Sequence, residues 1–208
     1  MRNGVIFGDP FARVRAYKER MAHALVDTEL MKALQSGAPG AEDRMVSVWL
    51  PTVLRWCDRL GGPRVDSEEA AHDVLLTAIR RIDRVYDAER FPAWLFGITR
   101  RTVARMRLRA WYRRWVPGAS IERADPNGGP ARLYEVSETG KMVHEIMETL
   151  PAIEREVLML CLLEERSDTE AASLLGIPAG TVKSRLRRAR ENFMRTARAR
   201  GLAEGVAQ

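Results

Sequence analysis

The strongest constraint on the fold is a helix-turn-helix pattern over residues 169–190. Gly176 stands where a tight turn between two helices needs a positive φ. Pro178 suits the first turn of the second helix, because its missing N–H costs no helical hydrogen bond there. Small and apolar residues before the turn predict the packing face of the first helix: Ala171, Ala172, Leu174 and Leu175. The stretch therefore predicts two helices joined by a tight turn.

The second helix of this pattern is strongly basic on one face. Val182, Leu186 and Ala189 recur at spacings of four and three residues, so they can face the core together. The side chains left to point outward are Lys183, Ser184, Arg187, Arg188 and Arg190. Such a helix fits a DNA major groove, where its cations meet phosphates and guanine edges. A solvated amphipathic helix would carry a similar charge run, but the turn and the small residues before it favour DNA binding.

Charge is distributed unevenly along the chain. The formal net charge of +6 favours an anionic partner. Positive charge concentrates in residues 100–114 and 183–200, while residues 66–73 and 164–170 are acidic. Two separate basic helices suggest two separate nucleic-acid contacts.

The first basic segment also contains aromatic residues. Trp94, Phe96, Trp111, Tyr112 and Trp115 interleave with Arg100, Arg101, Arg105, Arg107, Arg109, Arg113 and Arg114. Aromatic rings stack on unpaired bases and arginines neutralise the backbone, so this mixture suits single-stranded or opened DNA. Trp94 follows the core pattern of Leu95 and Ile98, which favours burial over base stacking. The arginines lack acidic partners at nearby helical positions, so ion pairs along the helix explain them poorly.

The predicted fold is all-α, because no strand-like alternation is sustained anywhere. We expect two helical domains joined by a flexible linker. The predicted ranges are an N-terminal extension (1–26), a first helical domain (27–116), the linker (117–139) and a second helical domain (140–208). The linker is rich in proline and glycine and buries too little apolar surface to offset the entropy of ordering.

Local signals mark two helices of the first domain. Apolar residues predict a long amphipathic helix over residues 42–60, in which Pro51 predicts a kink or break. Asp66 with Glu69 three residues later marks the start of the next helix.

Site chemistries other than nucleic-acid binding find no support. His23, His72 and His144 stand apart, without the His, Cys or Asp spacing of a metal site. The chain lacks a phosphate-cradling glycine loop and any Ser/His/Asp or Cys/His nucleophile arrangement. We therefore expect no catalytic residue, no bound metal and no cofactor.

The sequence predicts a cytoplasmic protein without membrane insertion. Cys57 and Cys161 are expected to pack as small hydrophobes, which fits a reducing compartment. The longest apolar run, residues 157–163, is too short to span a bilayer. Asp9 and Arg13 interrupt the apolar core that a signal peptide needs.

Four segments resemble the extracytoplasmic-function group of bacterial sigma factors, the minimal members of the sigma-70 family. Residues 66–74 (Asp-Ser-Glu-Glu-Ala-Ala-His-Asp-Val) resemble the family's region 2.2. Residues 91–98 (Phe-Pro-Ala-Trp-Leu-Phe-Gly-Ile) resemble region 2.3, which runs into the basic helix of region 2.4. Residues 150–158 (Leu-Pro-Ala-Ile-Glu-Arg-Glu-Val-Leu) and 180–186 (Gly-Thr-Val-Lys-Ser-Arg-Leu) resemble region 4.

This resemblance, over roughly residues 27–115 and 140–195, implies a sigma factor that binds core RNA polymerase and directs it to particular promoters. It implies that an acidic helix docks on the β′ clamp helices of the polymerase through Glu68, Glu69, His72 and Asp73. An acidic exposed face opposite an apolar stripe suits such docking. The resemblance also implies that the −10 element is captured and melted by Tyr86, Asp87, Trp94, Arg100, Arg101 and Arg105. Flipping a base costs a few kcal/mol, which stacking and phosphate contacts must offset.

The same resemblance implies that the −35 element is bound by Pro178, Gly180, Thr181, Lys183, Ser184, Arg187 and Arg188. The first three would hold phosphates through backbone groups, and the other four would read the element. The linker would thread through the polymerase cleft toward the RNA exit path, and the second domain would bind the β flap. An anti-sigma factor is a further expected partner.

The sequence departs from the family pattern at three positions. Arg101 stands where the family often has Asn, Arg105 where Asp is common, and His72 where Gln is usual. The two arginines suggest stronger phosphate contact, with some loss of sequence discrimination at the −10 element.

Two other functions stay open on the sequence. A conventional transcription regulator would use the helix-turn-helix as a dimer, with the N-terminal helices as a sensor or dimerisation domain. An interaction protein that mimics a sigma factor would bind an anti-sigma protein without supporting transcription. The arginine-rich helix and the acidic helix before it favour the sigma factor, because a dimeric regulator needs neither.

Overall fold

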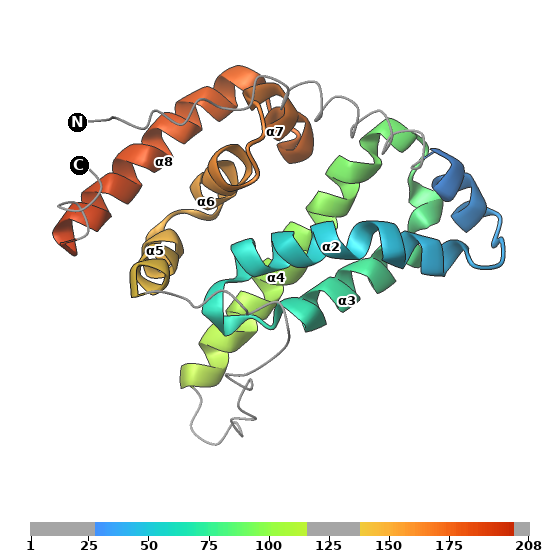
Figure 1. The fold of residues 1–208 in the computed structure, drawn as a ribbon, viewed down its shortest axis with the longest axis horizontal. Coiled ribbons are helices and arrows are strands. Elements are labelled where there is room, and N and C mark those ends of the chain that lie inside the picture. Colours follow the sequence, from blue (N-terminus) through green and yellow to red (C-terminus); the bar gives the residue numbers. More distant parts are fainter. Residues whose placement is uncertain (1–27, 116–137, 202–208) are drawn as a thin grey trace, which may run out of the picture.

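The computed structural model describes residues 28–115 and 138–201. The predicted N-terminal extension and most of the predicted linker lie outside the described residues. Every regular element in the described ranges is a helix, which confirms the all-α prediction (Figure 1). We refer to residues 28–115 as the first unit and to residues 138–201 as the second unit.

The first unit contains a short helix followed by longer ones. Residues 28–35 form the short helix, and the longer ones are α2 (Ala41–Gly61), α3 (Ser67–Ile79) and α4 (Phe91–Trp115). Turns of 3₁₀ helix lie between them, at Gly62–Arg64, Ile82–Arg84 and Ala88–Arg90. Each of α2, α3 and α4 packs against the other two, so the three helices enclose the core of this unit (Figure 1).

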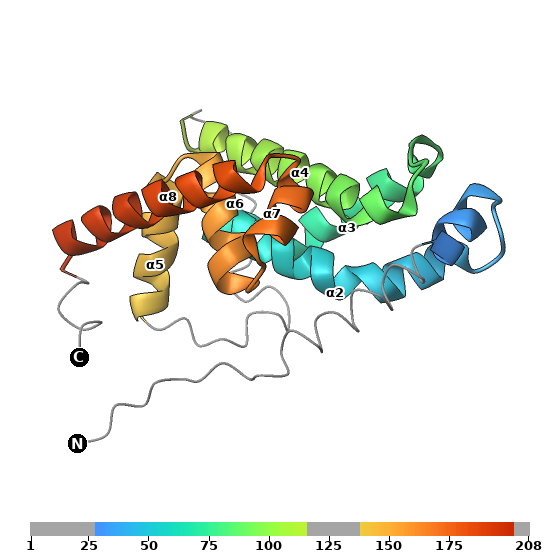
Figure 2. The same cartoon turned by 90° about the horizontal axis from the view of Figure 1, so that it is seen from above.

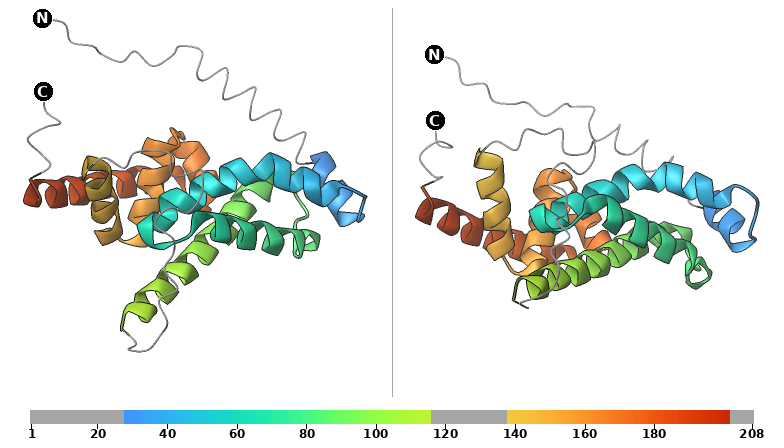
Figure 3. Two further views of the ribbon diagram at one scale, coloured as in Figure 1. Left: turned by 60° about the horizontal axis from the view of Figure 1, so that its bottom comes forward. Right: turned by 90° about the horizontal axis from the view of Figure 1, so that it is seen from below.

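The second unit is built around its last helix. Its helices are α5 (Glu138–Thr149), α6 (Ala152–Leu158), α7 (Asp168–Leu175) and α8 (Ala179–Ala199), with a π-helical turn over Met159–Leu163. α8 packs against α5, α6 and α7. α5 begins at Glu138, slightly before the predicted start of the second domain. The helix at 28–35 and the C-terminal end of α8 lie at opposite ends of the molecule (Figure 2 and Figure 3).

α2 runs continuously through Pro51, so of the predicted kink or break the break does not occur. A proline inside a helix removes one backbone hydrogen bond and crowds the preceding turn, at a cost of ~3 kcal/mol. Trp49 and Val53, on either side of Pro51, are both buried in the same core. This shared burial holds both halves of α2 against the same partners, and α2 ends at Gly61.

Four aromatic rings tie α2 to α4. Trp56 lies edge-on to Phe96 with their ring centroids 5.0 Å apart, and Trp49 lies edge-on to Phe91 at 5.4 Å. The centroids of the two tryptophans are 6.4 Å apart. Tilted aromatic pairs of this kind add to the stabilisation from burying large apolar rings. The first turns of α4 are therefore anchored on α2.

The two units pack against each other. One continuous hydrophobic cluster joins the core of the first unit to side chains of the second, namely Val157, Met159, Leu160, Ala171, Leu175 and Val182. α7 lies against α4 (Figure 2). The sequence predicts two helical domains joined by a flexible linker, which leaves their relative placement open. The structure places the units in contact, because apolar side chains of both share one core.

Replacing Trp56 with alanine is expected to lower the free energy of unfolding by about 3–5 kcal/mol. The side chain is 2% exposed, so its removal leaves a large cavity between α2 and α4. Chemical denaturation followed by circular dichroism measures the loss. Leu50→Ala in the same helix is the control, because Leu50 is 38% exposed. Equal losses in the two variants would contradict the assigned core.

Candidate nucleic-acid interface

The helix-turn-helix forms as the sequence predicts. Ser167 caps α7: its hydroxyl oxygen accepts from the N–H of Glu170 at 3.3 Å, and the Glu170 carboxylate accepts from the N–H of Ser167 at 2.9 Å. This reciprocal pair satisfies two N–H groups that the helix leaves unpaired. Gly176 ends α7 with a φ of 66°, the left-handed conformation that the turn needs.

α8 begins one residue later than expected. Pro178 is its N-cap residue rather than a member of its first turn. The carbonyl of Pro178 accepts from the N–H groups of Thr181 at 2.9 Å and Val182 at 3.1 Å, so the proline still starts the helix. Val182 and Ala189 are fully buried and Leu186 is half-buried, as the spacing predicts.

The opposite face of α8 presents polar and charged side chains to solvent. Of the residues predicted to bind the −35 element, Thr181 is half-buried, and those exposed are Pro178, Gly180, Lys183, Ser184, Arg187 and Arg188. Arg187 pairs with Glu191 one turn further on, at 2.9 Å. Within the described residues neither Lys183 nor Arg188 makes an ion pair. Their charges are therefore available to phosphates or base edges.

The turn before α4 presents two of the predicted −10 residues. Tyr86 is 91% exposed. The carboxylate of Asp87 accepts from the N–H of Glu89 at 3.0 Å and pairs with Arg90 at 3.3 Å, which fixes the turn. An exposed aromatic ring on a fixed turn can stack on an unpaired base.

Trp94 occupies an intermediate position between core and surface. It is half-buried, with its ring centroid 5.7 Å from that of Phe91. Trp94 therefore packs against the core but is not fully buried in it.

The arginines of α4 have acidic partners that the local sequence does not reveal. Arg100 pairs with Glu156 of α6 at 2.7 Å, and Arg105 pairs with Asp73 of α3 at 3.9 Å. Arg101 is exposed. The expectation that ion pairs explain these arginines poorly is wrong for Arg100, Arg105 and Arg107, because each pairs with a carboxylate from another helix.

A hollow of about 640 Å³ lies where the two units meet. We refer to it as the interunit hollow. Its lining comes from the turn before α4, from α4 itself and from α7 with its following turn, and includes Arg84, Tyr86, Asp87, Arg90, Trp94, Gly97, Arg100 and residues 173–176. Four of the predicted −10 residues thus share one space, while Arg101 and Arg105 do not line it. The helix-turn-helix forms the opposite wall and partly covers this face of α4.

The four predicted polymerase-docking residues of α3 face two directions. Glu68 and His72, one turn apart, line a groove between α2 and α3. Glu69 and Asp73, also one turn apart, face α4, where Asp73 meets Arg105. Successive residues of a helix are rotated by about 100°, so the four side chains span an arc of about 140° on the side of α3 away from its buried stripe. Glu68, Glu69 and His72 are exposed there and Asp73 is half-buried.

The α2–α3 groove has an apolar lining that the sequence analysis did not assign to docking. Its volume is about 340 Å³, and its apolar residues are Val46, Leu50, Leu54, Leu75, Leu76 and Ile79. A groove of this kind accepts the apolar face of a partner helix. The sequence does contain a signal for this groove. Val46, Leu50 and Leu54 recur every four residues, so they share one face of α2, beside the stripe that is buried in the core.

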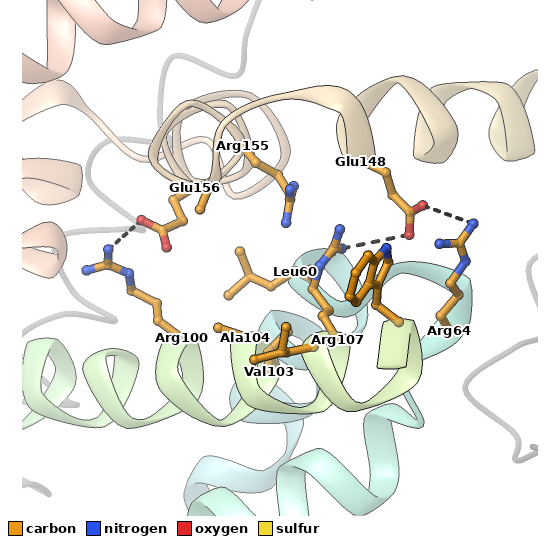
Figure 4. Close-up of a pocket in the computed structure, with 12 residues that line it drawn as sticks. Leu60, Arg64, Arg100, Val103, Ala104, Arg107, Glu148, Arg155 and Glu156 are labelled. Atoms are coloured by element: carbon orange, nitrogen blue, oxygen red, sulfur yellow. Dashed lines mark hydrogen bonds and ion pairs between the residues drawn. The ribbon is translucent and has the colours of Figure 1, made fainter. Parts of the chain in front are cut away.

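Two arginines at the contact between the units, Arg107 and Arg155, stabilise the fold by donating hydrogen bonds to backbone carbonyls (Figure 4 shows both side chains). Arg107 donates to two carbonyls at the C-terminal end of α2, each at 3.2 Å. Arg155 donates to two carbonyls at the end of α5, at 2.9 and 3.1 Å. Burial lowers the pKa of both guanidinium groups, and that of Arg155 falls to about 10. Both remain protonated at neutral pH and cap helix ends.

Residues 28–115 and 138–201 were predicted to hold no metal and to cross no membrane, and the structure bears on both points. No group of three or more His, Cys, Asp or Glu side chains is placed there to hold a metal ion. None of the helices in these ranges combines the length and apolarity needed to cross a membrane. Cys57 and Cys161 are free thiols. Burial, with a smaller effect from Asp58, raises the pKa of the Cys57 thiol to about 12, so this side chain stays protonated.

Known families match both units. The model of Sigma-70 region 2 matches residues 45–114, and the model of Sigma-70 region 4 matches residues 140–193. Together these matches cover more than half of the chain.

Two curated relatives and one solved structure are similar to this chain. It is 32% identical over 195 residues to the probable RNA polymerase sigma factor RfaY of Xanthomonas campestris pv. campestris, covering 88% of this chain and 48% of that protein. It is 29% identical over 155 residues to the ECF RNA polymerase sigma factor SigE of Mycolicibacterium smegmatis, covering 73% and 59%. The chain thus spans about half of the length of these relatives.

The solved structure is that of the sigma factor RpoE in complex with the anti-sigma factor NepR from Bartonella quintana. It aligns with a TM-score of 0.54 and 25% identity, over 75% of this chain and 96% of RpoE. The helix-turn-helix of the second unit falls within the region 4 match, and the arginine-bearing α4 within the region 2 match. The chain therefore belongs to the sigma-70 family of RNA polymerase sigma factors, in its extracytoplasmic-function group.

Proposed function

We propose that this chain acts as an RNA polymerase sigma factor, which binds the core enzyme and directs it to particular promoters. The observation that carries the proposal is the presence of region 2 and region 4 in one chain, each with its own cationic helix. A dimeric regulator needs one DNA-reading helix in each subunit, and neither a second basic helix nor an acidic face on α3. The core enzyme supplies the active site, so the chain needs no catalytic residue or cofactor of its own.

In this proposal, α8 binds the −35 element in the major groove. Lys183, Arg187 and Arg188 supply the cations on its exposed face. The N-terminal end of α8 lies at Gly180 and Thr181, where the positive end of the helix dipole suits a phosphate, although the N–H of Thr181 already donates to the Pro178 carbonyl. Ser184 lies among these residues, although its hydroxyl already donates to the Thr181 carbonyl at 3.0 Å.

The −10 element would meet the turn before α4 and the exposed side of α4. The ring of Tyr86 is free to stack on a flipped base, and Asp87 and Trp94 lie on the same hollow. Arg100, Arg101 and Arg105 would neutralise the backbone of the opened strands. The arginines at 101 and 105 favour phosphate contact over base discrimination, because a guanidinium binds any phosphate.

The α2–α3 groove would receive the β′ clamp helices of the polymerase. Glu68 and His72 lie at the groove, and its leucines offer an apolar surface to a partner helix. Glu69 and Asp73 face α4, so in this proposal they support the melting helix more than the docking surface. The second unit would bind the β flap.

An anti-sigma factor is a further proposed partner, and the cytoplasm is the proposed location. The similarity to RpoE, solved in complex with the anti-sigma factor NepR, supports the partner. A protein that works on chromosomal DNA together with core polymerase needs access to both, which supports the location.

Transcription in vitro tests the proposal directly. The full chain is added to core polymerase free of other sigma factors, with a library of randomised promoter templates. We expect initiation at a small subset of templates that share two conserved elements. Binding to core polymerase during size-exclusion chromatography separates this function from a dimeric regulator. A folded chain that neither co-elutes with core enzyme nor supports initiation on any template would refute it.

Arg188→Ala is expected to weaken binding of duplex promoter DNA. If Arg188 contacts a phosphate, the slope of log affinity against log salt falls by about 0.9 and all sequences are affected alike. If it contacts a guanine edge, the loss is about 1–3 kcal/mol and concentrates at one base pair. Fluorescence anisotropy at several salt concentrations measures both. Arg195→Ala, two turns further along α8, is the control, and an equal loss there would contradict a specific role for Arg188.

Leu50→Glu is expected to weaken binding to core polymerase at least tenfold, because it places a carboxylate on the apolar lining of the α2–α3 groove. Binding is measured by surface plasmon resonance with immobilised core enzyme. Ser47→Glu adds the same charge to an exposed position of α2 outside the groove lining and serves as control. Duplex binding through α8 should stay unchanged in both. Unaltered polymerase affinity in Leu50→Glu would remove the groove from the docking surface.

A further inference from the structure

The turn before α4 presents Tyr86 to solvent on backbone that is held on both sides. The side chains of Ile82 and Val85 are 7% and 4% exposed, so they anchor the start of the turn in the core of the first unit. After Tyr86, the Asp87 carboxylate accepts from the N–H of Glu89 at 3.0 Å. Tyr86 itself is 91% exposed. The direction of its ring is therefore set by the backbone beside it and not by packing.

A side chain from a distant part of the sequence binds this backbone. The side-chain amide nitrogen of Gln35 donates to the carbonyl oxygen of Val85 at 2.8 Å and to that of Ile82 at 3.3 Å. Both partners are carbonyl oxygens, which only accept, so the amide has to present its nitrogen to them. Gln35 is the last residue of the short helix over residues 28–35, which lies beside the turn (Figure 1). The bonded residues are 50 and 47 positions apart, so only the folded first unit brings them together.

The helix that contains Gln35 is itself fixed in the core. Leu30, Met31 and Leu34 of this helix are all buried there. The chain leaves the helix through Gly37, which has a φ of 66° and donates its N–H to the Leu34 carbonyl at 3.1 Å. The backbone of Gln35 is therefore held on both sides, and its side chain reaches the turn from a fixed position.

The shorter of the two hydrogen bonds acts on the peptide group that joins Val85 to Tyr86. A peptide group is planar, so a hydrogen bond to its carbonyl oxygen limits rotation of the whole group. That rotation changes ψ of Val85 and φ of Tyr86, and with them the direction in which the ring leaves the backbone. Val85 has an extended backbone, with φ −100° and ψ 107°. Burial of the Val85 side chain holds its Cα but does not by itself fix the peptide group that follows.

We propose that Gln35 is a positioning residue for Tyr86: it fixes the Val85–Tyr86 peptide group and so sets where the Tyr86 ring meets an unpaired base. A binding group needs its direction held by the residues around it. A base stacked on a fixed ring presents its edge to the turn in one orientation, whereas a ring that moves accepts several. The inference rests on the proposed function for the role of Tyr86, but the effect of Gln35 on the turn is a property of the free chain.

Hydrogen–deuterium exchange of the full chain tests the effect on the turn without DNA or polymerase. Gln35→Glu keeps the length of the side chain, but a carboxylate has no N–H to donate and repels the two carbonyl oxygens. Because Gln35 is exposed, the substitution removes no core packing. The N–H of Arg84 bonds the Arg81 carbonyl and that of Val85 bonds the Ile82 carbonyl, so both report on the turn. We expect them to exchange about three- to tenfold faster, as the loss of one or two hydrogen bonds implies.

Two further variants separate the hydrogen bonds from charge and from general loosening. Lys32→Gln lowers the net charge by the same amount as Gln35→Glu, at an exposed position of the same helix, and should leave exchange in the turn unchanged. Gln35→Lys returns a donor to the two carbonyl oxygens and should recover much of the protection. Circular dichroism checks helix content in each variant. Unchanged exchange in Gln35→Glu, or equally fast exchange in Gln35→Glu and Gln35→Lys, would overturn the proposal.

Promoter opening by the chain bound to core polymerase tests the action through Tyr86. Templates that the unmodified chain selects from the randomised library are varied one base at a time in the −10 element. In Gln35→Glu we expect the preference among the four bases to fall several-fold at one position, with binding of the −35 element unchanged. A merely structural role for Gln35 would instead reduce opening on all templates alike.

A double-mutant cycle shows whether Gln35 acts through the ring. In a chain that already has Tyr86→Ala, Gln35→Glu should cause no further loss of base preference, because the ring that it orients is gone. An equal loss with and without the ring would separate Gln35 from Tyr86 and refute the positioning role. A chain whose turn loosens in Gln35→Glu, but whose unmodified form supports no initiation, would refute the sigma-factor proposal alone, so the two failures are distinguishable.

Discussion

The groups that pair with the guanidinium groups of α4 determine whether this helix can bind nucleic acid. One side of α4 is fixed in the core by Phe91, Phe96 and Val103, so the helix cannot rotate its arginines away from the surface. An arginine stays charged at any physiological pH and needs carbonyls, carboxylates, phosphates or water around it. The described structure provides the first two, and in the proposed function promoter DNA provides the third.

The arginines of α4 divide into roles according to their partners. Arg107 donates to backbone carbonyls at the end of α2 and is part of the fold. Arg105 shares the long ion pair with Asp73 of α3, so its charge is only partly engaged. Arg100 pairs with a carboxylate of the other unit, and Arg101 lies in solvent. A single helix thus combines structural cations with cations that can change partner, and position along the helix alone does not separate them.

Local chemistry explains which predictions succeed. The turn at Gly176 and the buried stripe of Val182 and Ala189 depend on residues close in sequence, and both are confirmed. The break at Pro51 is wrong because burial on both sides outweighs the missing hydrogen bond. The partners of Arg100 could not be predicted, since Glu156 reaches it only after two units with no sequence proximity share one core.

The contact between the two units combines an apolar part with an ionic part. Its apolar part, with Leu160, Ala171 and Leu175, fixes how the units sit together. Its ionic part adds little net stability, because the attraction within a buried ion pair roughly offsets the cost of removing both charges from water. The apolar side chains therefore supply most of the free energy that holds the two units together.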